Sequence, residues 1–516
     1  MKLSDLQDIR LEKARALRDQ GTNPWPNRAQ RTHTNSEALA RFETAQAADD
    51  LTDDQTLVEP MTLVGRIASL RHMGKTLFAH IEDGHGRIQL YIRKDAIGDD
   101  VYADILKLYD LGDFIQASGS LFRTRTGEIS LRVTQITMLS KTINAPPEKW
   151  HGLQDVEIRY RQRYLDLLSS EEVRRVFRVR ARIITAIRAF LDQRDYLEVE
   201  TPTLQPLYGG AAARPFTTHH HALDQELYLR IADELYLKRL LVGGYERVYE
   251  ICKDFRNEGI DRNHSPEFTM LEFYEAYADY ESMMDTVEAL IVSVTTTAHG
   301  GPRFTFQDQE IDVTPPWPRK TLRDAIRDKS GIDYADHPEQ ADLLRVAREA
   351  GADIEEGTVW PRIVDELLKQ FVRPTLVQPT FLIDYPVELS PLAKRKTDDP
   401  THVERFQPIV GRVIELGNAF TELNDPLDQL ARFQVQQKDR DAGDEEAMPI
   451  DLDYVTALMY GMPPTGGVGI GIDRLVMLLA DQPTLRDVIL FPAMRRLPTA
   501  NAQNSVESTS DESPEP

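Results

Sequence analysis

Residues 247–274 read RVYEICKDF, RNEGIDRNHSP and EFTMLEFY in succession, and this stretch decides the fold. The first and third parts alternate apolar and polar residues, which predicts strands over 247–255 and 267–274. The intervening loop is too short for a helical crossover, so the two strands form a hairpin. The loop places Arg256, His264 and Phe268 around one turn. An antiparallel sheet that carries polar chemistry at its hairpin is therefore expected here.

Further strand signals surround this hairpin, over 226–231, 380–385 and 412–423. Upstream, Val176, Val179, Ile183, Ile187 and Phe190 recur at helical spacing, and a short strand over 196–202 ends in a proline. Residues 281–375 are expected to be mainly helical. Because neighbouring strands lack regular helical crossovers, we predict an α+β domain with an antiparallel sheet flanked by helices.

A second domain is predicted before this one. Residues 86–93 place Ile88, Leu90 and Ile92 on one face of a strand and Gln89 on the other. Four more strands, over 63–70, 76–81, 113–122 and 128–139, and a helix over 100–109 suit a five-stranded barrel of the oligonucleotide-binding type, the OB-fold. The expected domains are a helical extension and linker (1–55), the barrel (56–145), a linker (146–168), the α+β domain (169–497) and a disordered acidic tail (498–516).

Composition narrows the class of protein. The net charge of -23 over 516 residues argues against coating nucleic acid without regard to sequence, so any RNA contact must be local. A single cysteine, Cys252, excludes internal disulfides and fits a reducing compartment. Charged residues interrupt the N-terminus, and no apolar run reaches membrane-spanning length. We expect a cytoplasmic protein.

The segment GGVGIGIDRLVMLL at 466–479 predicts a glycine-rich strand that runs into a helix. Arg474 then lies in the first helical turn, where the helix dipole disfavours a cation unless an anion shares the site. A bound phosphate explains this arginine. In the hairpin loop, Arg256 could bind an α-phosphate and Phe268 could stack on adenine, although a phenylalanine at such a position more often fills a core.

These segments resemble motifs 2 and 3 of the class II aminoacyl-tRNA synthetases, and 190–202 resembles motif 1; within the class, the similarity is greatest to the members that act on lysine. The resemblance implies ATP, L-lysine and tRNA(Lys) as substrates, and a homodimer formed through motif 1. It implies that Arg256 and Arg474 are catalytic, with Arg474 at the γ-phosphate. It also places Arg256, Glu258, His264, Phe268, Glu415 and Arg474 at ATP. Many members have an arginine directly before the motif 2 histidine, whereas this chain has Asn263, with Arg262 one place earlier.

A pocket for lysine must take an ammonium out of water, which requires carboxylates with good geometry. Asn418, Phe420 and Glu422 share one face of a strand, Glu272 and Tyr274 share a face of another, and Glu234 opens a helix. By resemblance, the lysine pocket comprises Gly210, Glu234, Glu272, Tyr274, Asn418, Phe420 and Glu422.

Glu415 and Glu422 are the candidate ligands for Mg²⁺, since carboxylate oxygens suit this hard cation. Their separation of seven residues places them on opposite faces of a regular strand, so we predict a bulge near Gly417 that brings them together. The family usually has a further metal-binding glutamate upstream. Gln407 stands near that position, and Glu404 is the only nearby substitute.

On the barrel, the resemblance assigns the anticodon contacts to Arg71, Phe78, Gln89 and Glu128. Such residues suit unpaired bases, which are read by stacking and by hydrogen bonds to their edges. Phe78 could instead belong to the barrel core, which makes Gln89 the safer assignment. His219, His220 and His221 do not form a zinc site, because three consecutive side chains cannot converge on one ion.

The expected activity is a two-step ligation, in which lysine attacks the α-phosphate of ATP and the tRNA ribose then attacks the adenylate. One alternative is an aspartate- or asparagine-specific member of the class, which the glutamates at 234, 272 and 422 disfavour. Another is a degenerate member retained for RNA binding or regulation. Arg256, Glu415 and Arg474 disfavour it, while Gln407 keeps it open.

Overall fold

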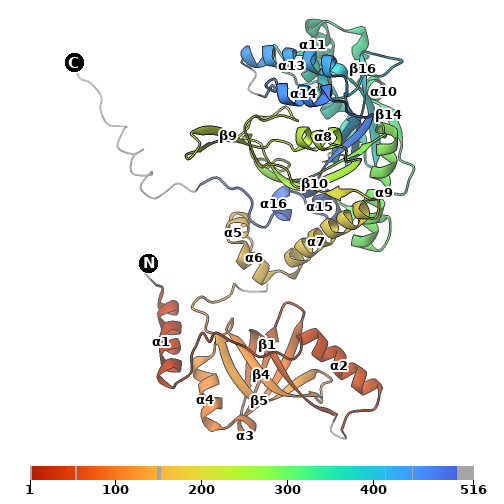
Figure 1. The fold of residues 1–516 in the computed structure, drawn as a ribbon. Coiled ribbons are helices and arrows are strands. Elements are labelled where there is room, and N and C mark those ends of the chain that lie inside the picture. Colours follow the sequence, from red (N-terminus) through yellow and green to blue (C-terminus); the bar gives the residue numbers. More distant parts are fainter. Residues whose placement is uncertain (1–2, 53–54, 148–152, 413, 444–445, 497–516) are drawn as a thin grey trace, which may run out of the picture. The chain divides into compact units, whose positions relative to one another are not determined.

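The computed structural model describes residues 3–52, 55–147, 153–412, 414–443 and 446–496, and the chain divides near residue 153 into two compact units (Figure 1). The acidic tail predicted at 498–516 lies outside the described residues. Within those ranges, no helix combines the length and the apolar character that crossing a bilayer requires.

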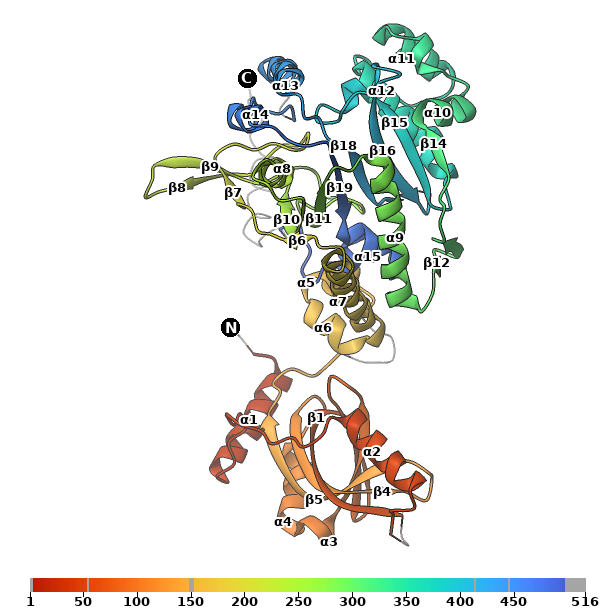
Figure 2. The same ribbon diagram turned by 45° about the vertical axis from the view of Figure 1, so that its right-hand side comes forward.

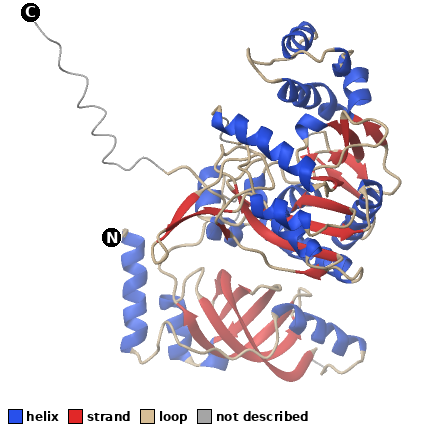
Figure 3. Ribbon diagram, turned by 45° about the horizontal axis from the view of Figure 1, so that its top comes forward, coloured by secondary structure: helices blue, strands red, loops and turns tan. Residues whose placement is uncertain are grey.

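The first unit is a closed five-stranded barrel with strand order β1-β2-β3-β5-β4, as an OB-fold requires (Figures 2 and 3). Its strands alternate buried and exposed positions, so one face of each fills the interior. The five predicted strands and the helix before β4 are confirmed. The elements are β1 (Thr56–Met73), β2 (Thr76–Glu82), β3 (Arg87–Arg93), α3 (Lys94–Ile97), α4 (Asp99–Leu108), β4 (Phe114–Arg123) and β5 (Ile129–Ser140).

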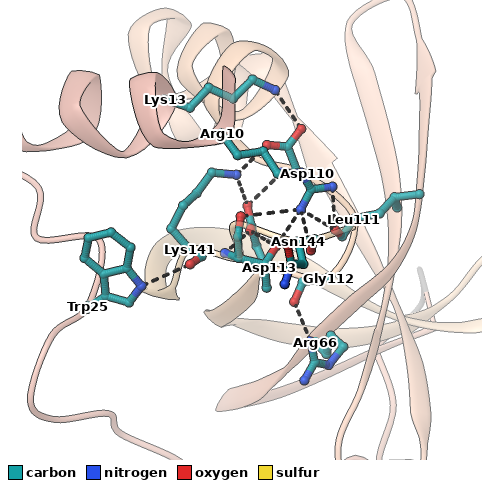
Figure 4. A network of polar contacts seen from close by, with 11 residues as sticks. Arg10, Lys13, Trp25, Arg66, Asp110, Leu111, Gly112, Asp113, Lys141 and Asn144 are labelled. Carbon is teal, nitrogen blue, oxygen red and sulfur yellow. Dashed lines mark hydrogen bonds and ion pairs between the residues drawn. The ribbon is translucent and has the colours of Figure 1, made fainter. Parts of the chain in front are cut away.

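Helix α1 (Asp5–Asp19) is fastened to the barrel by a network of charges (Figure 4). Lys141 is buried and pairs with Asp113 at 2.7 Å and Asp110 at 2.5 Å. Asp110 also receives Lys13 of the helix at 2.6 Å. Because each buried charge has a partner of opposite sign, the network fixes where the helix docks.

The polar stretch after α1 contains a helix that the sequence analysis did not predict, α2 (Asn35–Ala47). Its residues Ala38, Phe42 and Ala45 have no exposed surface and belong to the barrel core. Thr34 caps it by accepting a hydrogen bond from the Glu37 backbone. The region before the barrel is therefore packed structure, where the sequence suggested only an extension and a linker.

The second unit contains a nine-stranded sheet with order β14-β15-β16-β18-β19-β11-β10-β6, and β17 pairs with β16 beside this path. The inner pairs are antiparallel as predicted, but the outermost pairs, β10 with β6 and β14 with β15, are parallel. The predicted antiparallel sheet is thus confirmed for the inner strands, and parallel pairs extend it at both edges. The strands are β6 (Leu197–Glu198), β10 (Arg247–Phe255), β11 (Glu267–Ala276), β14 (Arg319–Thr321), β15 (Thr380–Pro386), β16 (His402–Val410), β17 (Ile414–Glu415), β18 (Gly417–Thr421) and β19 (Thr465–Gly471).

Alternation along β11 separates the two faces of this sheet. Leu271 and Phe273 join a core formed with α7 (Glu171–Asp192), α9 (Tyr280–His299) and α15 (Ile472–Leu479). Glu272 and Tyr274 point to the opposite face. That face is covered by α8 (Glu234–Val242) and by helices that include α10 (Leu322–Ser330), α11 (Gln340–Glu349), α12 (Trp360–Leu367), α13 (Pro426–Asp441) and α14 (Leu452–Met459). The polar site is built on this second face.

Shorter elements complete the unit. Residues 281–375 are not all helical, because β12 (Arg303–Phe306) and β13 (Gln309–Asp312) form a hairpin within them. Outside the main sheet, β7 (Leu204–Gln205), β8 (Thr217–His220) and β9 (Gln225–Leu229) form a small three-stranded sheet. The remaining helices are α5 (Val156–Arg161), α6 (Arg163–Ser169) and α16 (Leu485–Val488).

Candidate active site

One cavity of about 380 Å³ lies on the polar face of the sheet. Every residue that the sequence analysis placed at ATP, at lysine or at the metal lines it. These are Gly210, Glu234, Arg256, Glu258, His264, Phe268, Glu272, Tyr274, Glu415, Asn418, Phe420, Glu422 and Arg474. They come from segments separated by more than 200 residues in the chain. The structure thus brings the complete predicted set to one place.

One end of the cavity is basic. Arg256 leaves the end of β10 with its guanidinium 5.0 Å from the centre of the Phe268 ring, which belongs to β11. Arg474 lies in the first turn of α15, as predicted, and donates to the backbone oxygen of Glu415 at 3.1 Å. Neither arginine side chain forms an ion pair within the described chain, so both positive charges are available to an anion.

The hairpin loop closes this end. His264 is exposed, and its Nδ1 lies 2.8 Å from Asp261. Asn263 lines the cavity, while Arg262 is exposed and contributes its backbone oxygen to a hydrogen bond from Leu485. The side chain of Arg262 therefore does not take the place of the arginine that the family has next to this histidine.

The predicted bulge near Gly417 is confirmed. Glu415 pairs with Ile409 and Ala419 pairs with Phe406, so four steps along β17 and β18 oppose three along β16. The extra residue shifts the alternation by one position. Glu415 consequently reaches the cavity together with Asn418, Phe420 and Glu422.

Glu415 is held from two sides. Arg373 donates to its Oε2 at 2.7 Å, and Gln407 donates to its Oε1 at 3.0 Å. Gln407 is itself buried and accepts a hydrogen bond from Tyr385 at 2.8 Å. Glu404 is three residues earlier on β16, with opposite parity, and does not line the cavity. Gln407 therefore lies on the side of β16 that contacts Glu415, whereas Glu404 lies on the opposite side, and neither of the two lines the cavity.

The other end of the cavity is acidic and contains a cation that the sequence analysis missed. Lys238 has no exposed surface, pairs with Glu234 at 2.5 Å and also forms an ion pair with Glu422. Its ammonium lies 5.2 Å from the centre of the Phe420 ring. The spacing of Glu234 and Lys238 resembles an ordinary surface pair, so the sequence contains no signal of its burial.

Free acceptor capacity remains beside this pair. Glu422 uses Oε2 for Lys238, while its Oε1 has no hydrogen-bond partner among the described residues. The site needs Gly467 here, since a Cβ at that position would lie 2.0 Å from Glu422 Oε1 and 2.5 Å from the Tyr274 ring. Tyr274 donates to Glu272 at 2.7 Å. These carboxylates form a receptor for an ammonium group.

Asn418 is positioned by a half-buried arginine that was not predicted. Arg405 donates to Asn418 Oδ1 at 2.7 Å and to the Leu389 backbone oxygen at 2.7 Å. Burial lowers the pKa of Arg405 from its ordinary value. The guanidinium fixes the side-chain amide of Asn418, which leaves the amide nitrogen to donate toward the cavity.

Burial changes the acid–base behaviour of the acidic end. It raises the pKa values of Glu234, Glu272 and Glu422, and the attraction of Lys238 opposes this for Glu234 and Glu422. For Lys238, burial acts to lower the pKa, but the nearby Glu234 and Glu422 raise it overall. Lys238 therefore stays charged. The carboxylates of Glu234, Glu272 and Glu422 lose their charge at a higher pH than exposed glutamates do.

The predicted anticodon residues lie on neighbouring strands of the barrel. Arg71 of β1 pairs with Phe78 of β2, whose ring centre is 5.3 Å from that of Tyr91 on β3. Phe78 is only partly buried and does not belong to the core, while Arg71 is exposed. An accessible ring beside an exposed arginine can stack on a base.

Gln89 differs from the prediction because it is buried, with 9% exposure, although it lies on the face opposite Ile88 and Leu90. Its side chain donates to Glu128 at 2.6 Å and accepts from Ser130 at 2.8 Å. Glu128 is exposed and also bonds His80 at 2.9 Å. Of the two residues, Phe78 is therefore the more accessible, and His80 joins the cluster.

The three consecutive histidines lie at the tip of the β8–β9 hairpin and are exposed. His219 and His221 approach each other, with 3.4 Å between their Nδ1 atoms, while His220 accepts from the Leu223 backbone. Three histidines do not converge on one point, as predicted. Among the described residues, they join no group of three or more metal-binding side chains.

Comparison with known proteins matches both units. Residues 155–495 fit the family described as tRNA synthetases class II (D, K and N), and residues 61–139 fit the OB-fold nucleic acid binding domain. The chain is 55% identical to a protein named “Lysine--tRNA ligase” from Roseiflexus castenholzii over 96% of this chain and 99% of that protein. It is 53% identical to a protein from Chloroflexus aurantiacus over 96% of this chain and 99% of that protein. It is 52% identical to a protein from Moorella thermoacetica over 95% of this chain and 98% of that protein. Both carry the same name.

Proposed function

The chain belongs to the lysine–tRNA ligases of the class II aminoacyl-tRNA synthetases, and from this premise we propose how its residues divide the work of activating lysine with ATP and charging tRNA. The observation that carries the proposal is the polarity of the cavity. Arg256 and Arg474 line its basic end, and Glu234, Glu272 and Glu422 line its acidic end. Such a cavity holds phosphates at one end and an ammonium at the other.

In the first step, a lysine carboxylate oxygen attacks the α-phosphorus of ATP and pyrophosphate leaves. Arg256 neutralises the charge that grows on the α-phosphate, and Phe268 stacks on the adenine. Glu258 and His264 contact the nucleotide from the hairpin loop, and Arg474 holds the γ-phosphate. Since no group of the protein becomes covalently bonded, positioning and charge carry the catalysis.

In the second step, the terminal ribose hydroxyl of tRNA attacks the carbonyl carbon of the adenylate and AMP leaves. The lysine side chain stays in the acidic end throughout, where its ammonium is received by Glu234, Glu272, Tyr274 and Glu422. Gly210 closes the pocket from the loop before β8. Its φ of +91° suits glycine, and a Cβ there would lie 2.9 Å from Ala232.

We propose that Glu415 and Glu422 would hold Mg²⁺ for the reaction with ATP. When bound, the ion supplies positive charge to the phosphate oxygens. The donor set fits, because carboxylate oxygens suit this cation and one of them has no hydrogen-bond partner. Gln407 bonds Glu415 through its amide nitrogen and so contributes no charge.

Gln407→Glu tests this arrangement. The new carboxylate would face Glu415 across 3.0 Å, where the amide now donates, so the variant should be less stable without metal. A divalent cation between the two carboxylates would reverse the repulsion. We expect the Tm of the variant to rise with millimolar MgCl₂ by several degrees more than that of the unmodified protein. Gln434→Glu, at an exposed position of α13, is the matched control. Equal magnesium responses in all three proteins would contradict the proposed position of the ion.

The charge of the acidic end predicts how lysine binding depends on pH. The carboxylate forms of Glu234, Glu272 and Glu422 bind the ammonium, and burial raises their pKa values. Binding is therefore lost as pH falls through these raised values, at a higher pH than for exposed glutamates. In ATP–pyrophosphate exchange, we expect the KM for lysine to rise about tenfold between pH 7.5 and 5.5, with a much smaller change in the KM for ATP. Aspartate should support no exchange. A flat lysine profile, or exchange with aspartate, would contradict the assignment.

We further propose that the Arg71, Phe78, Gln89 and Glu128 face of the barrel reads the anticodon. Phe78 offers a stacking surface and the exposed Glu128 offers a carboxylate, while the buried Gln89 holds Glu128 in place through its side-chain amide. A homodimer through motif 1 is supported by Leu197 and Leu204, which are 45% and 46% exposed at and near the edge strand β6. The buried, unpaired Cys252 fits a cytoplasmic location.

A further inference from the structure

Asp233 has a buried carboxylate to which no described residue donates a hydrogen bond. It has no exposed surface, and neither of its side-chain oxygens has a hydrogen-bond partner among the described residues. It occupies the N-cap position of α8, where an aspartate ordinarily accepts from the first backbone N–H groups of the helix, yet its side chain makes no such bond. The carboxyl group is thus turned away from the helix that it could cap.

The side chain lies instead against the floor of the lysine pocket. Oxygens of Asp233, Asp254 and Glu272 lie within 4.8 Å of one another, and all three residues are buried. Glu272 lines the cavity, whereas Asp233 and Asp254 do not. Asp233 therefore lies behind Glu272, which faces the cavity.

The carboxylates of Asp233, Asp254 and Glu272 have too few cations around them to neutralise all of their charges. Arg230 pairs with Glu250 at 2.7 Å and lies 3.5 Å from Asp254, and the charge of Arg256 also acts on Asp254. Cys252 is neutral, because burial raises the pKa of its thiol. On the pocket side, Glu234 pairs with Lys238, and Tyr274 donates to Glu272. No described cation pairs with Asp233 or Glu272.

Two adjacent buried carboxylates cannot both keep their charge, so they hold a proton between them. The pKa of Asp233 is raised mainly by burial and next by the negative charge of the nearby Asp254. The pKa of Glu272 is raised mainly by burial and next by the negative charge of Asp233. A neutral carboxylic acid beside a carboxylate donates a hydrogen bond to it, which fixes its orientation.

We propose that Asp233 is a positioning residue for lysine binding, which holds a proton and donates it as a hydrogen bond to Glu272 so that Glu272 faces the substrate ammonium as one oriented carboxylate. When the ammonium arrives, the proton stays on Asp233, and no proton is gained or lost by the pair. The proposal rests on Glu272 being a contact of lysine, as proposed above.

The test compares Asp233→Asn, whose amide also donates, with Asp233→Val, which has similar size and no donor. The KM values for lysine and ATP are measured in ATP–pyrophosphate exchange between pH 6 and 9. Asp233→Val should raise the KM for lysine about tenfold or more and leave that for ATP within about twofold. Asp233→Asn should stay within about threefold of the unmodified protein at pH 7.5. It should also abolish the part of the pH dependence of the lysine KM that comes from loss of the shared proton at alkaline pH.

Asp308→Asn is the matched control, since Asp308 is exposed in the β12–β13 turn with a φ of 62° that asparagine tolerates. Thermal unfolding identifies a variant that does not fold, and in that case the pH profile of Asp233→Asn alone decides. The proposal would be overturned if Asp233→Asn and Asp233→Val raised the KM for lysine equally, or if the pH profile were the same with and without the Asp233 carboxyl. Glu272→Gln tests the premise that Glu272 contacts lysine. An unchanged KM for lysine in that variant would show that Glu272 is not part of the lysine pocket, and the proposed role of Asp233 would fall with it.

Discussion

Arg256→Ala is expected to lower the kcat of lysine-dependent ATP–pyrophosphate exchange by about 10²–10³-fold at saturating substrates. Arg256 lines the basic end of the cavity, and its guanidinium forms no ion pair with the described residues. Its charge is therefore available to the α-phosphate, where negative charge grows during attack. Removing one such preorganised donor typically costs about 10²–10³ in rate.

Arg256→Lys should also be impaired, because a single ammonium cannot reproduce the planar fork of donors that a phosphate accepts. Folding should be little affected, since the only hydrogen bond from the Arg256 side chain to a described residue is a 3.4 Å contact with the Ile231 backbone oxygen. Calorimetric unfolding checks this point for both variants.

Arg345→Ala is the control for this experiment. Arg345 is exposed on α11 and pairs with Asp342 and Glu349, away from the cavity. Exposed pairs contribute little to stability, so both kcat and Tm should stay near their original values. An Arg256→Ala protein that retains more than about a tenth of the exchange rate would remove Arg256 from the proposed transition-state contacts.

The predicted residues of the cavity came partly from local signals in the sequence and partly from the resemblance to the class II synthetases, which supplied Gly210 and Glu258 among others. Arg256 and Phe268 flank a hairpin loop, Arg474 follows a glycine-rich strand, and the bulge at Gly417 follows from the parity of two glutamates. Strand alternation and helix periodicity depend on neighbours in the chain, so these elements were predictable.

What remained hidden depends on long-range packing. Lys238 lies four residues after Glu234 on α8, a spacing typical of solvated helix faces, but α8 packs against β10, β11 and α14 and Lys238 is buried. The same holds for Asp233, which ordinarily would be an N-cap. Gln89 alternates outward on β3 but is covered by Glu128, and α2 was concealed in a polar stretch. The parallel pairing at the sheet edges also joins distant segments.

Glu422 provides the second large effect, because it serves two cations at once. Its Oε2 pairs with the buried Lys238, and its Oε1 is free to receive the substrate ammonium or Mg²⁺. Glu422→Gln should raise the KM for lysine by about 10²-fold, as expected for removing one partner of a buried charge pair. It should also lower the free energy of unfolding by about 3 kcal/mol, because Lys238 keeps only Glu234.

These two effects can be separated with Lys238→Met, which removes the internal cation and nearly preserves side-chain volume. In the double variant Lys238→Met/Glu422→Gln, glutamine no longer leaves a buried ammonium short of charge, so much of the stability lost in Glu422→Gln should return. The KM for lysine should not recover, since the substrate ammonium still lacks its carboxylate. Urea unfolding and exchange kinetics on the four proteins measure both couplings. If the double variant regained lysine affinity along with stability, Glu422 would act only by neutralising Lys238, and the acidic end would be a structural ion pair instead of the receptor for the substrate.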